Sequence, residues 1–202
     1  MASEGTDSMI GRMIRASRLD VHIFEEVEAD TSATRQALLV VAFVALATGL
    51  ASLGTTGPIG LFVGIVLSIA GWAFWAWIVH LIGTKIMASP STHADWGQLA
   101  RTLGFAQSPG IFKVLGLVPV IGNIIFAVAS IWMLVAMVVA VRQALDYTST
   151  WRAIAVVLIG FIPYVLLMSI AFAFLGDLGL SLIHIRRCRR IERCRYRWTP
   201  YH

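Results

Sequence analysis

Long apolar runs separated by short polar connectors dominate the sequence after its first 34 residues. Four runs stand out, at residues 37–53, 59–87, 120–141 and 151–175. The shortest of them would extend about 26 Å as an α-helix, just enough to cross a membrane. The pattern therefore predicts an all-α fold, a polytopic membrane helix bundle in which each run is one crossing.

The stretch between the second and third of these runs, residues 101–123, is apolar but interrupted. Pro109 must break any helix that precedes it, because proline forces the residue before it out of the α region. Residues 111–118 would then extend only about 12 Å if helical, less than half of the hydrocarbon core. The stretch either completes a distorted third crossing, which gives five in all, or dips into the membrane and leaves four.

Positive charge decides between these alternatives, since loops on the cytoplasmic side carry an excess of Lys and Arg. With the N-terminus inside, Lys85 and Arg101 lie in the cytoplasm under either topology. Five crossings also bring Arg142 and Arg152 inside, whereas four would leave both outside. We therefore expect about five transmembrane helices with a broken third span.

Irregular backbone at membrane depth survives only when protein surrounds it or when it lines a cavity, so the broken span should be enclosed by the other helices. Lys113 should snorkel toward the cytoplasmic face, or alternatively bind an anionic headgroup or substrate. Asn123 could bridge helices or cap a turn. The residues expected to pack or bind in this stretch are Gly104, Phe105, Ala106, Pro109, Gly110, Lys113, Pro119 and Asn123.

The N-terminal segment, residues 1–34, is expected to be cytoplasmic and amphipathic. Residues 9–24 place apolar side chains on one helical stripe with Arg12, Arg15 and Arg18 on its flank, which favours a helix in the headgroup region. The acidic residues that follow suggest a solvated linker. The segment lacks an apolar run that could serve as a secretory signal, so the first hydrophobic run is expected to be a retained anchor. Asp95 is placed to cap a short amphipathic helix at residues 96–103.

Composition agrees with a membrane protein, because 58% of the residues are hydrophobic and only 13% are charged. The formal net charge of +5 is concentrated in the last residues, 181–202, and does not indicate nucleic-acid binding. This tail holds both cysteines and resembles translated adapter or vector sequence, so we expect a sequence artefact. The alternative is a native basic tail that binds anionic lipid. The transmembrane domain itself is assigned to residues 35–180.

The residues suggest no enzyme and no cofactor. His22, His80 and His93 are not spaced as metal ligands, and the membrane runs contain no paired ionisable residues. The expected partners are membrane lipids and other membrane proteins. Oligomerisation could use a stripe of small residues, Gly60, Gly64 and Ser68, that would let another helix approach closely.

The element Gly104-Phe105-Ala106 with Pro109, followed by VPVIGN and a tryptophan-containing apolar helix, resembles the Yip domain (Ypt/Rab-interacting protein) family. The resemblance covers roughly residues 9–176 and implies a cytoplasmic N-terminal region before five membrane spans. It is closest to a prokaryotic-type member, in the cell membrane. It implies a non-enzymatic scaffold or adaptor of membrane organisation or trafficking. The alternative function is a small transporter or lipid-handling protein that uses the broken helix at residues 104–123.

Overall fold

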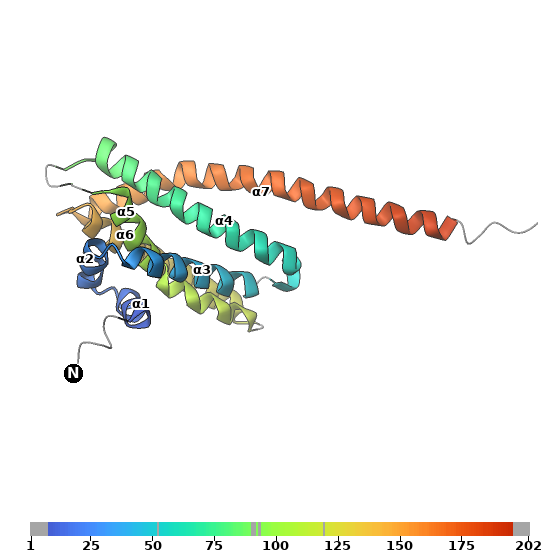
Figure 1. The fold of residues 1–202 in the computed structure, drawn as a ribbon, viewed down its shortest axis with the longest axis horizontal. Helices are drawn as coiled ribbons and strands as arrows, with labels where there is room; N and C mark the ends of the chain where they lie inside the picture. Colours follow the sequence, from blue (N-terminus) through green and yellow to red (C-terminus); the bar gives the residue numbers. More distant parts are fainter. Residues whose placement is uncertain (1–7, 52, 90–91, 93, 119, 196–202) are drawn as a thin grey trace, which may run out of the picture. The chain divides into compact units, whose positions relative to one another are not determined.

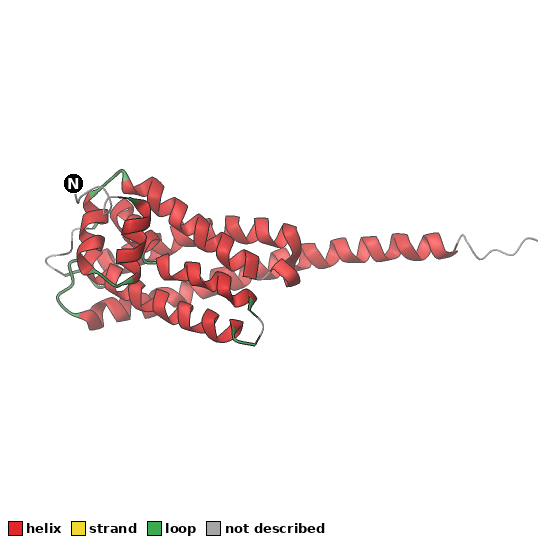
Figure 2. Cartoon of the chain, turned by 90° about the horizontal axis from the view of Figure 1, so that it is seen from below, coloured by secondary structure: helices red, strands yellow, loops and turns green. Residues whose placement is uncertain are grey.

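The computed structural model describes the backbone of residues 8–51, 53–89, 92, 94–118 and 120–195. Side chains are described in the same ranges except at 53–56, 172 and 174–195. The chain divides into two units, Met1–Tyr164 and Val165–His202, and the description that follows concerns the first. Of the second unit, the described backbone up to Arg195 continues the last helix. In the described ranges all regular elements are helical (Figure 2).

The helices follow one another in the order drawn in Figure 1. They are α1 (Met9–Ser17), α2 (Val21–Ala29), α3 (Ala33–Ala51), α4 (Leu53–Leu81), the π-helix η1 (Ile82–Ile86), α5 (Trp96–Phe105), the 3₁₀-helix η2 (Ser108–Leu117), α6 (Gly122–Ala144) and α7 (Thr150–Arg195).

Among the described residues, four segments are long and apolar enough to cross a membrane: Ala33–Ala51, Gly57–Ile86, Gly122–Ala144 and Thr150–Ala171. They coincide with the four apolar runs of the sequence, which confirms an all-α, polytopic helix bundle. The second run starts after a backbone break at Gly57, whose φ of 66° glycine adopts without a Cβ clash. Pro58 follows, where a missing N–H costs least because it opens the helix.

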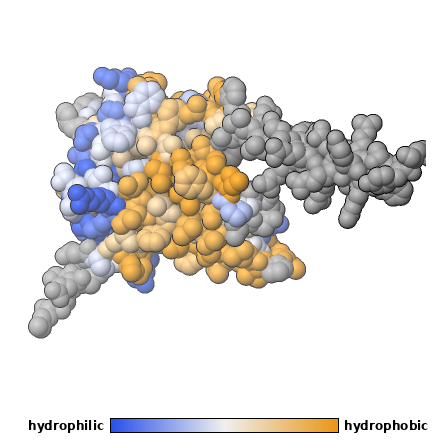
Figure 3. All heavy atoms as spheres, turned by 45° about the vertical axis from the view of Figure 1, so that its right-hand side comes forward, coloured by the Kyte–Doolittle hydropathy of each residue, from blue (hydrophilic) through white to orange (hydrophobic). Residues whose placement is uncertain are grey.

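One end of the bundle gathers the polar groups, and we call it the polar end. There Gln143 at the end of α6 donates a hydrogen bond to Glu25 of α2 at 2.9 Å. The Tyr147 hydroxyl donates to the carbonyls of Gly83 and Met87, which joins the turn after α6 to η1. Figure 3 shows hydrophilic residues collected along one edge, while hydrophobic residues cover most of the rest of the visible face.

The broken element α5–η2 leaves the polar end alongside α3 and in the same direction. A Cβ added to Gly104 would lie 2.8 Å from the Cβ of Ala37, and one added to Gly110 would lie 2.6 Å from Val44. Farther along, a Cβ added to Gly116 would lie 3.6 Å from the Cβ of Ala51 at the end of α3. Steps of six residues in α5–η2 thus match steps of seven in α3, because a 3₁₀-helix rises about 2.0 Å per residue against 1.5 Å in an α-helix.

The next helix, α6, returns toward the polar end. Gly122 at its start packs so closely on the Gly116 carbonyl that a Cβ there would overlap it, and Met133 farther along contacts Gly110. The C-terminal end of α6 reaches Glu25. The path therefore alternates in direction through α3, α4, α5–η2, α6 and α7, with the broken element in third place. The broken element is not one of the four segments long enough to cross a membrane alone, so five crossings stay a prediction.

The prediction that the other helices enclose the broken element is only half correct. All residues from Leu99 to Ala106 are buried, as are Ser108, Pro109 and Gly110. Beyond them η2 turns outward, with Phe112 42% and Leu117 58% exposed. The polar backbone of η2 still finds partners within its own helix, so an outward-facing second half is compatible with lipid.

The prediction of one helix at residues 9–24 followed by an acidic linker is wrong. The chain forms two helices, and Leu19 between them adopts a φ of 61°, the left-handed conformation that often ends a helix. Asp20 then caps α2 by accepting from the His22 amide at 3.0 Å. Glu25, Glu26 and Glu28 belong to α2, and the Glu26 carboxylate pairs with Arg12 and Arg15 of α1. The capping role of Asp95 is confirmed, since it forms a capping box with Gln98 at the start of α5.

Candidate functional site

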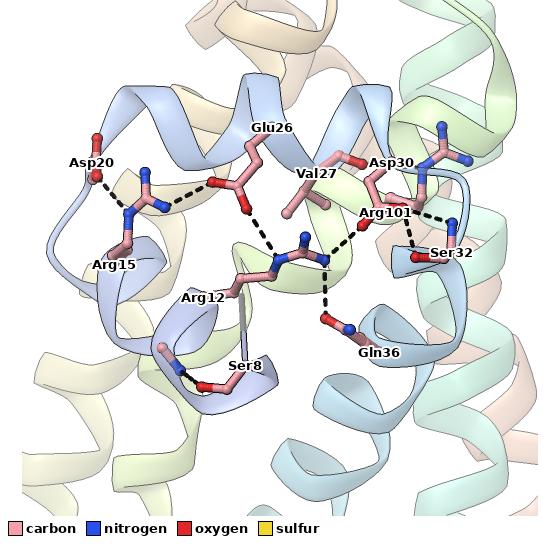
Figure 4. A network of polar contacts seen from close by, with 11 residues as sticks. Ser8, Arg12, Arg15, Asp20, Glu26, Val27, Asp30, Ser32, Gln36 and Arg101 are labelled. Carbon is pink, nitrogen blue, oxygen red and sulfur yellow. Dashed lines mark hydrogen bonds and ion pairs between the residues drawn. The ribbon is translucent and has the colours of Figure 1, made fainter. Parts of the chain in front are cut away.

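Helices α1 and α2 form a cap over the polar end, and Arg12 is the residue that joins them (Figure 4). Its side chain is 8% exposed and donates to Glu26 at 3.2 Å and to Asp30 at 2.9 Å. A third donor reaches Gln36 of α3 at 3.1 Å. Arg12 therefore ties α1 to both α2 and the bundle, instead of lying against headgroups as the sequence had suggested.

Arg15 strengthens the same contact. It donates to Asp20 at 2.9 Å and to the second carboxylate oxygen of Glu26 at 2.7 Å. The hydrogen bond and charge of Arg15 lower the pKa of Asp20, and the hydrogen bond from Ser32 together with Arg12 lowers the pKa of Asp30. Both carboxylates consequently stay ionised and keep α1 and α2 together at neutral pH.

Arg101 of α5 holds α2 from the other side. The residue is 6% exposed, and its guanidinium donates to the backbone carbonyls of Val27 at 3.2 Å and Glu28 at 2.7 Å. These carbonyls lie in the last turn of α2, where intrahelical partners run out and a positive charge also complements the helix dipole. Arg101 thus serves α2 as a C-terminal clamp supplied by a distant segment.

Glu28 carries the most perturbed carboxyl group of the cap. Its burial, followed by the nearby charge of Asp146 and a smaller contribution from Glu25, raises its pKa from 4.5 to about 7, although Arg101 opposes the shift. The group therefore changes charge near neutral pH, in contrast to Asp20 and Asp30.

The residues predicted from the broken element do come together, but they pack. Gly104, Phe105, Ala106, Pro109 and Gly110 are all buried. The close contacts of Gly104 and Gly110 with α3 and α6 leave no room for a side chain, let alone a ligand. Ser108, between them, satisfies its hydroxyl on the Phe105 carbonyl at 2.6 Å.

The remaining predicted residues lie apart from this packed cluster. The ammonium of Lys113 lies 4.9 Å from the centre of the Phe126 ring, close to the start of α6 and so toward the end of the bundle opposite to the polar end. Asn123 is exposed in the first turn of α6, where Ile121 occupies the N-cap position. Pro119 lies outside the described residues.

An apolar groove of about 550 Å³ opens between α1 and the bundle. Its walls come from four helices, among them Met13 and Ile14 of α1, Phe43 of α3, Ile111 of η2 and Trp132 of α6. Trp132 stacks on Phe112 of η2 with ring centres 5.7 Å apart. Within the described part of the chain, no cluster of His, Cys, Asp and Glu could hold a metal ion.

A known protein family matches the sequence of this helical chain. The model of the Yip1 domain matches residues 21–170, which is most of the chain. The chain belongs to the Yip1 domain family. No curated protein and no solved structure matches it.

The matched Yip1 domain begins at the first residue of α2 and ends within α7. The cap helix α2, its clamp Arg101 and the broken third element are therefore parts of the domain itself. Helix α1, with Arg12 and one wall of the groove, precedes the match. As a member of this family with several apolar helices, the protein is a multi-pass membrane protein.

Sequence reasoning missed the residues that build the α1–α2 cap. Arg12 was assigned to a helix in the headgroup region, and Glu26 and Asp30 were assigned to a separate solvated linker. One signal could have joined them: two arginines three residues apart, Arg12 and Arg15, are followed closely by an acidic cluster of similar length. Such neighbouring blocks of opposite charge can neutralise one another across a helix pair.

Proposed function

We propose that this Yip1 domain protein is a non-enzymatic membrane scaffold or adaptor that presents its α1–α2 cap to partner proteins. The observation that supports the proposal is the fixed geometry of the cap. Arg12 and Arg101, both buried, hold α2 from two sides. A surface that is ordered before binding loses less conformational entropy when a partner docks.

The outer side of the cap offers polar groups for such docking. His22 and Glu25 on α2 have side chains that are 83% and 58% exposed, in a segment otherwise anchored by buried residues.

The polar end also carries exposed basic residues, namely Arg35, Lys85, Arg142 and Arg152. Their positive charge favours a cytoplasmic location of this end, and hence of the N-terminus, in a prokaryotic cell membrane.

Site-specific photo-crosslinking in cells tests the scaffold proposal. A photoreactive amino acid at position 22, on the cap, should give discrete crosslinked protein bands. The same residue at position 62, where Phe62 is 70% exposed on the apolar face of α4, is the matched control. Absence of position-22 bands, or the same bands from both positions, would count against a partner-binding cap.

The transport alternative rests on the broken element, and the packing described above disfavours it. Neighbouring helices pack directly against Gly104 and Gly110, and the ammonium of Lys113 lies over the ring of Phe126. Reconstituted vesicles provide the test: saturable flux of a solute that Lys113→Ala abolishes would make transport the better proposal.

Self-association through α4 is a second way in which the scaffold could act. A Cβ at Gly64 would meet no heavy atom within 4 Å, and Ser68 is exposed, so this part of the small-residue stripe faces away from the bundle. Gly64→Leu should then lower the dimer fraction measured by single-molecule photobleaching in vesicles, with Phe62→Leu as the control.

A further inference from the structure

The groove between α1 and the bundle has an uneven distribution of polar and apolar groups. Apart from the satisfied Ser108, its polar lining residues are Ser17 and Arg18, which lie together at the C-terminal end of α1. The other lining residues are Met, Ile, Phe and Trp. One end of the groove is therefore cationic, and the remainder suits a hydrocarbon chain.

The position of the groove agrees with this division. Helix α1 is tied to the polar end through Arg12, whereas Phe43 lies about 15 Å along α3 from Ala33. Ile111 and Phe112, at the deep wall, follow Gly110, which packs halfway along α3 beside Val44. The groove thus extends from the membrane surface to the depth of the acyl chains.

The charge on α1 distinguishes Arg18 from the other arginines of the helix. Arg12 and Arg15 are neutralised by Asp20, Glu26 and Asp30. Arg18 is exposed and, among the described residues, forms no salt bridge. An anionic group at the mouth of the groove would complement this charge, and a membrane surface supplies such groups as phospholipid headgroups.

We propose that the groove is a specific site for one anionic phospholipid of the surrounding bilayer. One acyl chain occupies the apolar part between Ile14, Phe43 and Phe112, and the headgroup phosphate contacts Arg18. The volume of about 550 Å³ lies within the range of about 300–1,000 Å³ that is usual for small-molecule sites. Bound lipid fills the space beneath α1 and joins it to η2 and α6.

Photoreactive phospholipids test the site. The full chain is reconstituted in nanodiscs of phosphatidylcholine with a trace of phosphatidylglycerol that carries a diazirine on one acyl chain, and labelled peptides are mapped by mass spectrometry. Labelling should concentrate in residues 9–18 and 108–112, above the level found around Phe62 on the lipid-facing side of α4. Ile14→Trp, which enters the groove from its exposed rim, should reduce the groove labelling at least tenfold, while Phe62→Trp leaves it unchanged.

The headgroup contact is tested separately with Arg18→Gln. This variant should lower the preference for phosphatidylglycerol over an equally labelled phosphatidylcholine about fivefold, which corresponds to about 1 kcal/mol for one arginine at a membrane surface. Arg35→Gln, an exposed arginine elsewhere at the polar end, should not.

Several results would overturn the proposal. They are even labelling over all exposed apolar faces, labelling that Ile14→Trp leaves intact, or equal labelling by the two lipids with and without Arg18. Phe43→Trp fills the groove from α3, so loss of labelling in both variants excludes a local effect of one substitution on α1. A retained thermal transition shows that each variant is folded. The proposed partner binding by the cap is independent of these outcomes, because it is measured by protein crosslinks at position 22.

Discussion

Removal of Arg101 tests whether α2 depends on a clamp from the third membrane element. Arg101→Ala deletes two charge-assisted hydrogen bonds to carbonyls in the last turn of α2, at 3.2 and 2.7 Å. Hydrogen bonds to charged groups contribute about 1.5–3 kcal/mol each, and water can reach the freed carbonyls only if α2 separates from α5. We therefore expect the free energy that holds α2 in place to fall by about 3–5 kcal/mol.

Amide hydrogen exchange of the full chain in nanodiscs measures this loss directly. Since 1.4 kcal/mol corresponds to a factor of ten, exchange in residues 21–29 should accelerate about 100-fold or more. Exchange in α4 and α6 should change far less, because the Arg101 guanidinium donates its hydrogen bonds to α2 and to Thr34 of α3. Arg101→Lys should rescue only partly, since an ammonium lacks the planar fork that reaches two carbonyls at once.

The control for this experiment is Arg35→Ala, which removes an exposed guanidinium from the start of α3. If Arg101→Ala left the exchange of α2 within threefold of the unaltered chain, the clamp would be unnecessary and the apolar contacts of Ile23 and Phe24 would suffice. Uniform acceleration throughout the bundle would instead show that Arg101 stabilises the whole domain.

Three further results are expected. The pKa of Glu28 is raised to about 7, so this group ionises at lower pH in the unfolded chain than in the folded one, and the free energy of unfolding falls between about pH 4.5 and 7. Glu28→Gln should therefore raise the free energy of unfolding at pH 8 by up to roughly 3 kcal/mol, but not at pH 4, in detergent unfolding curves. Identical pH profiles of the two proteins would refute this. Gly104→Val should lower stability by about 1–3 kcal/mol because its side chain meets Ala37, whereas Gly64→Val, with open space around it, should cost less than half as much in the same assay. In a variant with both native cysteines replaced, Thr148→Cys should react with an impermeant maleimide only from the cytoplasmic side, and labelling from outside alone would contradict five crossings.

The crossings could be predicted because hydrocarbon imposes a simple rule on sequence. Each run must be apolar over a nearly fixed length, so residues 120–141 already indicate the helix that the structure has at Gly122–Ala144. The Asp95 cap could be predicted equally well, because all its partners lie within four residues. The Asp95 carboxylate accepts from backbone amides of the first turn, and the Gln98 side chain accepts from the Asp95 amide. Local chemistry and length were sufficient for both.

The cap could not be predicted in the same way, because its contacts are not local. Arg101 donates to Val27, which is 74 positions away in the sequence, and the residues around either one do not indicate this contact. The left-handed turn at Leu19 was also hidden, since leucine is uncommon at positive φ and carries no turn signal. Likewise, glycines that suggested a binding element proved to serve close helix packing, because the sequence shows small residues but not what lies against them.

The long separation between α2 and its clamp has a consequence for biogenesis. During synthesis α1 and α2 leave the ribosome before α5, and Glu26 of α2 can pair with Arg12 and Arg15 before Arg101 has been made. The last turn of α2 must wait for Arg101, which emerges only after α3 and α4 have entered the membrane. The last turn of α2 therefore becomes fixed only after α5 has packed against it. In a chain truncated before α5, the carbonyls at the end of α2 would lack the hydrogen bonds from Arg101.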